Sequence, residues 1–296
     1  MRSKMNKTKK IMAGIIYNLE KENACQSARE AKTWLEQQNV KVNLYGGGRV
    51  VAGFHEKEIR IDPETDFCIV FGGDGTFLYA ARKLAPLNIP LLCVNTGTLG
   101  FLSAISLQNI YKGLQLVLDK KYYIQERLML YVYVVDKNSN KTLSTFYALN
   151  DAVISKGAIA RLIKLVTYID GSYVTTYNAD GLIISTPTGS TAYALSSGGP
   201  ILTPTVSAII LAPICPHTLS LRPLVVSDIC CIKINLSLDY GTKDVVLTID
   251  GQELFELNSD HDIFITKSPY MAKLIKFQEE EDFFYTLQTK LQWGIK

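Results

Sequence analysis

The stretch DFCIVFGGDGTFL, residues 66–78, decides the fold of this chain. Its first part is a continuous apolar run of strand length, which is typical of a parallel strand covered on both faces. The run stops at two glycines and gives way to an apolar pattern with helical spacing, so Asp74 is expected where a buried strand turns into a helix. Because glycines let backbone N–H groups approach a ligand and a helix start carries partial positive charge, the stretch predicts a phosphate-binding turn. Asp74 is its unusual member, because a carboxylate repels phosphate unless it accepts a proton or holds a metal.

Strands and helices alternate on both sides of this stretch. The pattern predicts strands over 10–17, 40–44, 67–71 and 90–94, and helices over 20–38, 77–84 and 107–118. Such alternation implies right-handed crossovers and a doubly wound parallel sheet that binds ligands at the carboxyl ends of its strands. The glycine-rich segments 72–76 and 95–102 both lie at such ends. We therefore expect a Rossmann-like α/β domain over residues 1–121.

The pattern changes near residue 121, where β-branched and aromatic runs separated by turn signals begin. The predicted β runs are 122–135, 142–154, 161–169, 172–177, 182–184, 207–211, 229–236 and 244–249. They predict a mostly β domain over residues 122–268. The last segment, 269–296, carries a helical pattern over 277–293 and is expected to return to the first domain.

Length and composition exclude several classes of protein. With 296 residues, of which 47% are hydrophobic, the chain can bury a large core in two domains. No apolar run approaches the ~20 residues of a membrane-spanning helix, so we expect no membrane partner. The net charge is only +3, and the basic cluster in the first ten residues is interpreted as a solvated chain start rather than a nucleic-acid-binding arm.

Cysteine and histidine usage adds an expectation about the compartment and about metals. The six cysteines show no CxxC spacing, and three of them lie inside apolar runs, as expected of small buried side chains in a reducing cytoplasm. The three histidines are distant in sequence and have no partner at ligand spacing. We therefore expect no metal centre built by protein side chains.

A second motif, DGLIISTPTGSTAYALS, occupies residues 180–196 and is followed by Gly198-Gly199-Pro200. It places seven hydroxyl side chains within twelve residues, 185–196, without any charge. Such a loop suits the edges of a base and the hydroxyls of a ribose, and Tyr193 offers a ring for stacking. A Ser/Thr-rich turn between strands explains the same residues equally well.

Two further features carry weaker signals. His217, within PICPHTLSLRPL at 213–224, could be a base, but a lone histidine held by backbone hydrogen bonds is the preferred interpretation. Asn150-Asp151 supplies an amide and a second carboxylate, or simply ends a hairpin. No GxxxxGK(S/T) pattern occurs, which disfavours P-loop chemistry.

Taken together, the motifs resemble the NAD kinase family. The motifs that carry the resemblance fall in the order of that family: GGDGT at 72–76, Asn95-x-Gly97-x-x-Gly100-Phe101-Leu102, Asn150-Asp151, the 180–193 segment, Pro216-His217-Thr218-Leu219 and Asp250-Gly251-Gln252. The first is shared with diacylglycerol and sphingosine kinases and more loosely with phosphofructokinases, whereas the others are specific to the family.

The resemblance implies a reaction and an architecture. The reaction is transfer of the γ-phosphoryl group of ATP, accompanied by a divalent metal (Mg or Mn), to the 2′-hydroxyl of the adenosine ribose of NAD, which gives NADP. The architecture is a Rossmann-like domain and a β-sandwich-like domain with the site between them. A homodimer or homotetramer is implied, in which a neighbouring subunit helps to complete the NAD site.

The resemblance also implies roles for individual residues. Asp74 matches the proton acceptor. The implied NAD contacts are Asp74, Gly75, Asn150, Asp151, Arg161, Asn178, Asp180, Thr191, Ala192, Tyr193, Ala194, Leu195, Ser196 and Gln252. Arg161 is placed only by its spacing from Asp151. Asn178 is a departure, because many bacterial relatives have arginine at this position, and the missing charge bears on how the phosphates are held.

Two other functions compete with this interpretation. The first motif alone would suit a lipid kinase of the diacylglycerol kinase type, against which the polar loop and the lack of an apolar groove signal argue. A non-catalytic sensor of pyridine nucleotides would also bind NAD, but the intact Asp74 and both glycine motifs disfavour it.

Overall fold

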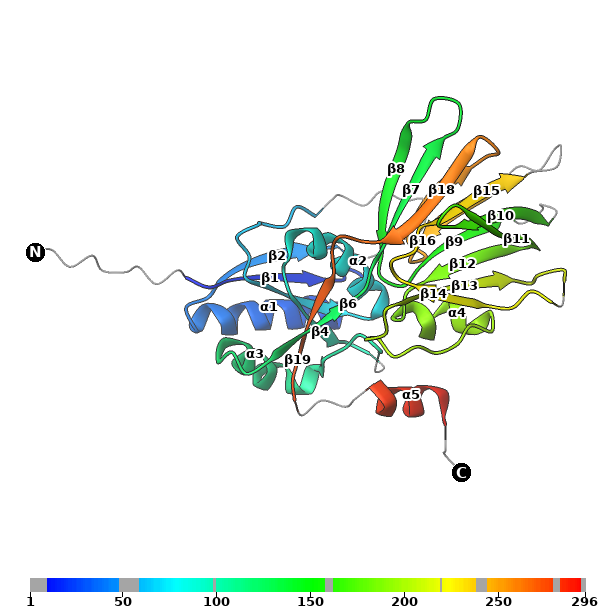
Figure 1. Cartoon of the computed structure of the whole chain (residues 1–296). Helices are drawn as coiled ribbons and strands as arrows, with labels where there is room; N and C mark the ends of the chain where they lie inside the picture. The colour runs from blue at the N-terminus through cyan, green and yellow to red at the C-terminus, as the bar shows by residue number, and fades with distance from the viewer. Residues whose placement is uncertain are drawn as a thin grey trace, which may run out of the picture. The chain divides into compact units, whose positions relative to one another are not determined.

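The computed structural model describes residues 10–47, 59–97, 100–157, 162–218, 220–237, 244–278 and 283–293 (Figure 1). Its contacts divide the chain into two compact units. Among the described residues, the first unit comprises those up to 47, 59–125 and those from 273 on, and the second comprises 126–272. Arg161, most of the N-terminal basic cluster and residues 98–99 of the second glycine-rich segment lie outside the described residues.

The first unit is built on a seven-stranded sheet with the order β2-β1-β3-β4-β19-β6, in which β5 pairs with β4. The strands are β1 (Met12–Tyr17), β2 (Lys41–Gly46), β3 (Phe67–Gly72), β4 (Leu91–Asn95), β5 (Ile105–Ser106), β6 (Tyr123–Arg127) and β19 (Ala272–Lys276). The pairs of β1 with β2 and β3, and of β4 with β3, β5 and β19, are all parallel. The predicted parallel-sheet domain is confirmed.

The helices that pack against this sheet are α1 (Glu22–Gln37), α2 (Asp74–Leu84) and α3 (Ile110–Leu118). The first unit also contains α5 (Phe283–Leu291), in which Thr286 and Leu287 are buried. In α1 the buried residues are Ala24, Ala28, Ala31 and Leu35, at the helical spacing that the sequence predicted. Because three of these side chains are methyl groups, the helix can lie close to the strands that it covers. The described α5 is shorter than the predicted helix over 277–293, since β19 extends to Lys276 and Phe277 is buried in the core.

The second unit contains two six-stranded antiparallel sheets, with the orders β11-β10-β15-β18-β7-β8 and β14-β13-β12-β9-β16-β17. The first sheet consists of β7 (Leu130–Asp136), β8 (Thr142–Ala148), β10 (Ile163–Ile169), β11 (Ser172–Ala179), β15 (Ile232–Ser237) and β18 (His261–Lys267). The second consists of β9 (Asp151–Lys156), β12 (Gly181–Ser185), β13 (Ala208–Ile214), β14 (Leu224–Ser227), β16 (Val245–Ile249) and β17 (Glu253–Leu257). One core cluster holds side chains of both sheets, such as Val132 and Leu165 from the first and Ile154 and Leu247 from the second. The predicted β-sandwich is confirmed.

Two predicted β runs are each divided in the structure. The run 122–135 becomes β6 and β7, which lie in different sheets and are separated by Leu128 and Met129. The run 142–154 becomes β8 and β9, which again lie in different sheets and are separated by Leu149 and Asn150. A strand that changes sheets must break its ladder of hydrogen bonds, but the apolar pattern continues through the break.

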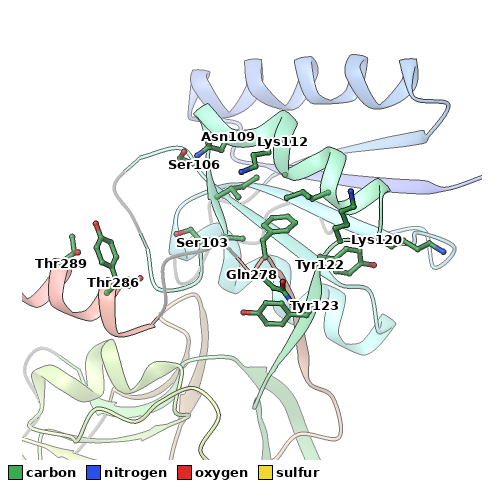
Figure 2. Close-up of a pocket in the computed structure, with 17 residues that line it drawn as sticks. Ser103, Ser106, Asn109, Lys112, Lys120, Tyr122, Tyr123, Gln278, Thr286 and Thr289 are labelled. Atoms are coloured by element: carbon green, nitrogen blue, oxygen red, sulfur yellow. The ribbon is translucent and has the colours of Figure 1, made fainter.

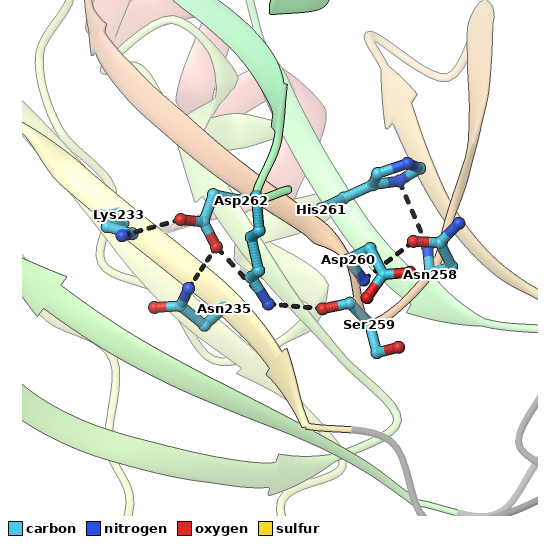
Figure 3. Close-up of polar contacts among 8 residues, drawn as sticks. Lys233, Asn235, Asn258, Ser259, Asp260, His261 and Asp262 are labelled. Carbon is cyan, nitrogen blue, oxygen red and sulfur yellow. Dashed lines mark hydrogen bonds and ion pairs between the residues drawn. The ribbon is translucent and has the colours of Figure 1, made fainter. Parts of the chain in front are cut away.

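A polar cluster lies on β15 and β18 of the second unit (Figure 3). Asp262 forms ion pairs with Lys233 at 2.7 Å and with Lys137 at 3.5 Å, and its Oδ1 accepts a hydrogen bond from the side chain of Asn235. Lys137 also donates to the carbonyl oxygen of Ser259 at 2.5 Å. Both carboxylate oxygens of Asp262 are therefore satisfied within the fold. The cluster links the hairpin before β18 to the neighbouring strands.

No helix in the described part of the chain is both long and apolar enough to cross a membrane.

Candidate active site

Asp74 lies at the first position of α2, and Gly73 alone separates it from the end of β3 at Gly72. Gly73 is extended, and its carbonyl accepts the N–H groups of Thr76 and Phe77, which starts the helix. The Asp74 carboxylate lies against Gly100, where an added Cβ would be 2.2 Å from Oδ1. The backbone N–H of Leu102 donates to the same carboxyl group. Residues 100–102 thus hold the Asp74 side chain, and only glycine leaves room for it at position 100.

The surroundings of Asp74 make its carboxylate take up a proton more readily than that of an exposed aspartate. Burial raises the pKa of Asp74, and the charge of Lys290 and the Leu102 N–H oppose this shift. Within the described residues, Asp74 Oδ1 is buried and has no hydrogen-bond partner, and the same holds for Thr96 Oγ1 after β4. Buried polar atoms are nearly always satisfied in folded proteins. Two unsatisfied oxygens at the carboxyl ends of neighbouring strands therefore indicate a place for a polar ligand.

In the second unit, the Asn150-Asp151 turn connects β8 to β9 and is held by Asp250. The Asp250 carboxylate accepts the backbone N–H groups of Leu149 at 3.1 Å, Asn150 at 2.7 Å and Asp151 at 3.1 Å. The sequence marked Asp250 only as part of the Asp250-Gly251-Gln252 motif, and nothing in its pattern indicated that it holds a turn about a hundred residues earlier. Gln252 follows it and is also buried.

Asp151 is 5% exposed, and its environment disfavours the ionised form. Burial, and then the nearby charge of Asp250, raise the pKa of Asp151 to about 7. At neutral pH this carboxyl can therefore donate a hydrogen bond as well as accept one.

Strand pairing brings the second-unit motifs to one edge of a sheet. β9 pairs with β12 and with β16, so that Asp151 lies opposite Ser185 and Ala152 opposite Ile249. The ends of these strands carry Asn150-Asp151, Ser185-Thr186 and Asp250-Gln252. Residues that are far apart in the sequence therefore form one group, as the order of motifs suggested.

The hydroxyl-rich segment differs in part from the expectation that its hydroxyls face a ligand. Ser185, Thr186 and Ser190 are fully buried and donate to backbone carbonyls of Asn150 at 3.1 Å, Leu149 at 2.5 Å and Pro187 at 2.6 Å, respectively. Short hydroxyl side chains readily satisfy nearby backbone groups in this way. Ser185 and Thr186 thus fasten the segment to the Asn150 turn, whereas Ser190 closes a turn within the segment. By contrast, Thr188 Oγ1 is buried and has no partner among the described residues.

The predicted adenosine-binding run, Thr191–Ser196, forms the end of a 3-10 helix, Gly189–Thr191, and the short helix α4 (Tyr193–Ser196). Tyr193 is 46% exposed, which leaves its ring available for stacking, whereas Ala194 is buried. The exposed ring of Tyr193 therefore lies beside the backbone groups of this short helix.

Asn178 and Asp180 lie at the end of β11 and the start of β12. Asn178 Oδ1 is buried without a partner in the described part of the chain. Asp180 forms an ion pair with Lys156 at 2.7 Å, a contact that the sequence did not reveal. The backbone N–H of His217 donates to the Asn178 carbonyl at 2.9 Å, and its side chain is exposed. His217 is thus held through its backbone, as the preferred interpretation expected.

A pocket of about 960 Å³ lies in the first unit, apart from these predicted residues (Figure 2). Its lining residues come mainly from α3, from the segment that leads into β6 and from α5. They include Ser103, which directly follows the 100–102 segment, and Thr286 and Thr289 on α5. None of the described residues that are predicted to bind NAD lines this pocket.

A glycine-rich turn with a carboxylate at a helix start in the first unit, and unsatisfied polar atoms beside a hydroxyl-rich segment in the second, are features of a nucleotide-binding phosphotransferase. Comparison with known domains gives the family. Residues 13–122 match the domain described as ATP-NAD kinase N-terminal domain, and residues 149–277 match the ATP-NAD kinase C-terminal domain.

Whole-chain comparisons agree. The chain is 42% identical over 284 residues to an NAD kinase of Syntrophobacter fumaroxidans, covering 95% of this chain and 98% of that protein. A yeast NADH kinase complexed with NADH superposes with a TM-score of 0.84 at 25% identity, over 98% of this chain and 89% of the yeast chain. An NAD kinase from Archaeoglobus fulgidus in complex with ATP superposes with a TM-score of 0.71 at 27% identity, over 95% of this chain and 99% of that chain.

The chain belongs to the NAD kinase family. It is an enzyme that phosphorylates NAD to NADP. The alternatives of a lipid kinase and of a non-catalytic sensor are therefore set aside.

Proposed function

We propose that the chain transfers the γ-phosphoryl group of ATP to the 2′-hydroxyl of the adenosine ribose of NAD, and that Asp74 accepts the proton of this hydroxyl. The observation that carries the proposal is the buried Oδ1 of Asp74, which has no partner among the described residues and lies where β3 turns into α2. A base must present a free oxygen within hydrogen-bond reach of the group that it deprotonates.

The mechanism follows from the demands of phosphoryl transfer. The protein must position the two substrates and neutralise charge, because little covalent chemistry is left to its side chains. The backbone N–H groups at the start of α2 and the helix dipole offer partial positive charge to the phosphates. Asp74 orients the ribose hydroxyl and takes its proton late, as the new O–P bond forms, since an aspartate is a much weaker base than an alkoxide. General-base catalysis of this kind contributes about 10² to 10⁴-fold.

The other predicted residues are proposed to bind the same NAD molecule on which Asp74 acts. Gly75 adjoins the acceptor, and Asn150 and Asp151 offer an amide and a carboxyl that can both donate and accept. Asn178 and Asp180, the run Thr191–Ser196 and Gln252 supply the remaining contacts. The unsatisfied Oδ1 of Asn178 and the exposed ring of Tyr193 support these roles. Arg161 keeps its proposed role as an NAD contact on the family resemblance alone.

A divalent metal, Mg or Mn, is proposed to arrive with ATP. Among the described residues, no group of three or more His, Cys, Asp or Glu side chains is arranged to hold a metal ion. We propose that its ligands are mainly phosphate oxygens of ATP, while Asp74 keeps its proposed role as the proton acceptor. When bound, such an ion neutralises charge on the triphosphate.

We further propose that the enzyme works in the cytoplasm as a homodimer or homotetramer. The six cysteines are all free thiols, which suits a reducing compartment. The family resemblance supports the assembly, in which a neighbouring subunit helps to complete the NAD site. Light scattering of the purified chain at several concentrations measures the oligomer size directly.

The Asp74→Asn variant tests the proposed proton acceptor. Asparagine keeps the shape of the side chain but cannot accept the proton, so kcat for NADP formation from ATP and NAD should fall by about 10² to 10⁴-fold. NAD binding and the melting temperature should stay close to those of the wild type. Asp119→Asn, at an exposed position after α3 in the same unit, is the control and should keep full turnover. A kcat of Asp74→Asn within threefold of the wild type would remove Asp74 from the chemistry.

A further inference from the structure

Two lysines from opposite ends of the sequence lie at the glycine-rich turn that carries Asp74. Lys21 is the residue before α1, in the segment that follows β1. Its Nζ lies 3.9 Å from the position that a Cβ on Gly73 would occupy. Lys290 is in the last turn of α5, near the C-terminus. The sequence did not connect any lysine or arginine with this turn, because neither residue is close to it along the chain.

Lys290 is held next to Asp74 through the segment 100–102. Its Nζ lies 5.9 Å from the centroid of the Phe101 ring, and the ring of Phe283, at the first position of α5, lies 6.0 Å from that of Phe101. Both ends of α5 therefore contact Phe101. The residues on either side of Phe101 touch the Asp74 carboxyl group, Gly100 through its close approach and Leu102 through its N–H.

The helix that carries Lys290 is a packed element of the first unit. Thr286 and Leu287 are buried, at 7% and 5% exposure. Figure 2 shows Thr286 and Thr289 on α5 beside the pocket to which Ser103 also contributes. Lys290, one residue further, instead reaches the Phe101 side of the same segment. Its ammonium group is thus placed by contacts along the helix.

A triphosphate needs more positive charge than the turn itself provides. Backbone N–H groups and a helix start supply only partial charges, whereas an ammonium group supplies a full charge and three donors. Within the described residues, neither Lys21 nor Lys290 forms a salt bridge, so their charges are available to a ligand. The charge of Lys290 also acts on Asp74, whose pKa it lowers against the effect of burial.

We propose that Lys21 and Lys290 are the cationic residues that bind the triphosphate of the phosphoryl donor at the Asp74 turn. This inference rests on the proposed function, in which Asp74 acts where the phosphoryl group is transferred. Lysine suits the task, because an ammonium group binds phosphate as a point charge and tolerates the change in geometry during transfer.

The test compares Lys21→Gln and Lys290→Gln with a matched control. The control is Lys83→Gln, because Lys83 lies 5.9 Å from the ring of Tyr79, the same distance as Lys290 from Phe101, but in the last turn of α2. Each test variant should raise the KM for ATP at least about tenfold and leave the KM for NAD within twofold, since only the donor loses a charged contact. Lys21→Arg and Lys290→Arg should recover most of the loss, and Lys83→Gln should behave as the wild type.

A binding measurement separates this inference from the proposed reaction. Inorganic tripolyphosphate titrated into the full chain by calorimetry should bind the wild type and bind Lys21→Gln and Lys290→Gln at least about tenfold more weakly. Unchanged tripolyphosphate affinity in both variants overturns the inference even if NADP is formed normally. Equal increases of the KM for ATP and NAD, or an equal effect of Lys83→Gln, also overturn it. Failure of Asp74→Asn to lose turnover instead contradicts the proposed proton acceptor and leaves the calorimetric result to decide the lysines.

Discussion

Two aspartates, Asp262 in the second unit and Asp74 in the first, show how differently the same side chain is used in this molecule. Asp262 is 9% exposed, and both of its oxygens have partners in Lys233, Lys137 and Asn235. Asp74 has one N–H donor from Leu102 and, among the described residues, an Oδ1 that is buried without a partner. The fold provides partners for both carboxylate oxygens of Asp262, but it leaves Oδ1 of Asp74 without one among the described residues.

The difference teaches which buried polar group belongs to the fold and which to a ligand. A satisfied carboxylate stabilises the packing around it, so its loss should lower stability and leave turnover intact. An unsatisfied one costs stability in the free protein and is retained only where a bound molecule completes it. The predictions below challenge this contrast, beginning with the largest expected effect.

Gly100→Ala should displace the Asp74 side chain while leaving its carboxylate group chemically unchanged. The added methyl group would lie 2.2 Å from Asp74 Oδ1, so the carboxylate must move away from its position. We expect kcat for NADP formation to fall about 10²-fold, because small displacements of a reacting group are costly. Steady-state kinetics at saturating ATP and NAD measure the effect.

The matched control is Gly97→Ala in the same segment, where the added Cβ would meet, among the described residues, only Asn95 Oδ1, at 3.9 Å. This variant should keep turnover within about threefold of the wild type, since such a distance is an ordinary contact. Equal kcat values for Gly97→Ala and Gly100→Ala would show that the Asp74 position does not depend on Gly100.

Asp262→Ala should show the opposite behaviour. Removing this carboxylate leaves Lys137, Lys233 and Asn235 without their shared acceptor, so the free energy of unfolding should fall by about 1–3 kcal/mol. Denaturant unfolding measures this loss, and kcat should be unchanged. The control is Asp260→Ala, an exposed neighbour in the same turn. A loss of turnover without a loss of stability in Asp262→Ala would break the contrast between the two aspartates.

Asp151 gives an effect that depends on pH. Because the pKa of Asp151 is raised to about 7 in the folded chain, the native state holds a proton there that the unfolded state has released above about pH 4. The stability from this group is therefore present below about pH 4 and is lost as the pH rises to about 7. It falls by at most about 1.4 kcal/mol per pH unit.

Asp151→Asn should remove this dependence of the unfolding free energy on pH. Unfolding free energies of the substrate-free wild type and variant, measured at several values between pH 5 and 8, isolate the contribution, because the other groups cancel in the difference. A wild type that gains stability relative to Asp151→Asn as the pH rises from 5 to 7 would contradict the sign.

The sequence predicted the strongly patterned elements of the fold. The buried run before Gly72, the alanine face of α1 and the succession of β runs were all recognisable, because apolar spacing records which face is covered. It missed β5, β14, β17, β18 and β19. Strands such as Glu253–Leu257 and Ala272–Lys276 are short and mix apolar with charged residues without regular alternation, so that their sequence gives no clear strand pattern.

For the site, the sequence located the motifs but not the residues that hold them in place. Asp74 was found because its turn is local, with the strand, the glycines and the helix in one stretch. Asp250, Lys21 and Lys290 act on residues that are distant in the chain, and only the folded arrangement shows such contacts. For the hydroxyls of Ser185 and Thr186 the sequence left a ligand and a structural turn equally open, because composition cannot distinguish internal hydrogen bonds from external ones.

The position of β19 bears on how the chain emerges from the ribosome. This strand is made near the end of synthesis, yet it lies between β4 and β6 in the sheet of the first unit. The intervening second unit is continuous over the described residues 126–272, so it can close before translation ends. The N-terminal strands, although translated first, must wait for nearly the whole polypeptide before their sheet is complete. Nascent chains that stop before Ala272 should therefore present an unfinished N-terminal half to chaperones and proteases.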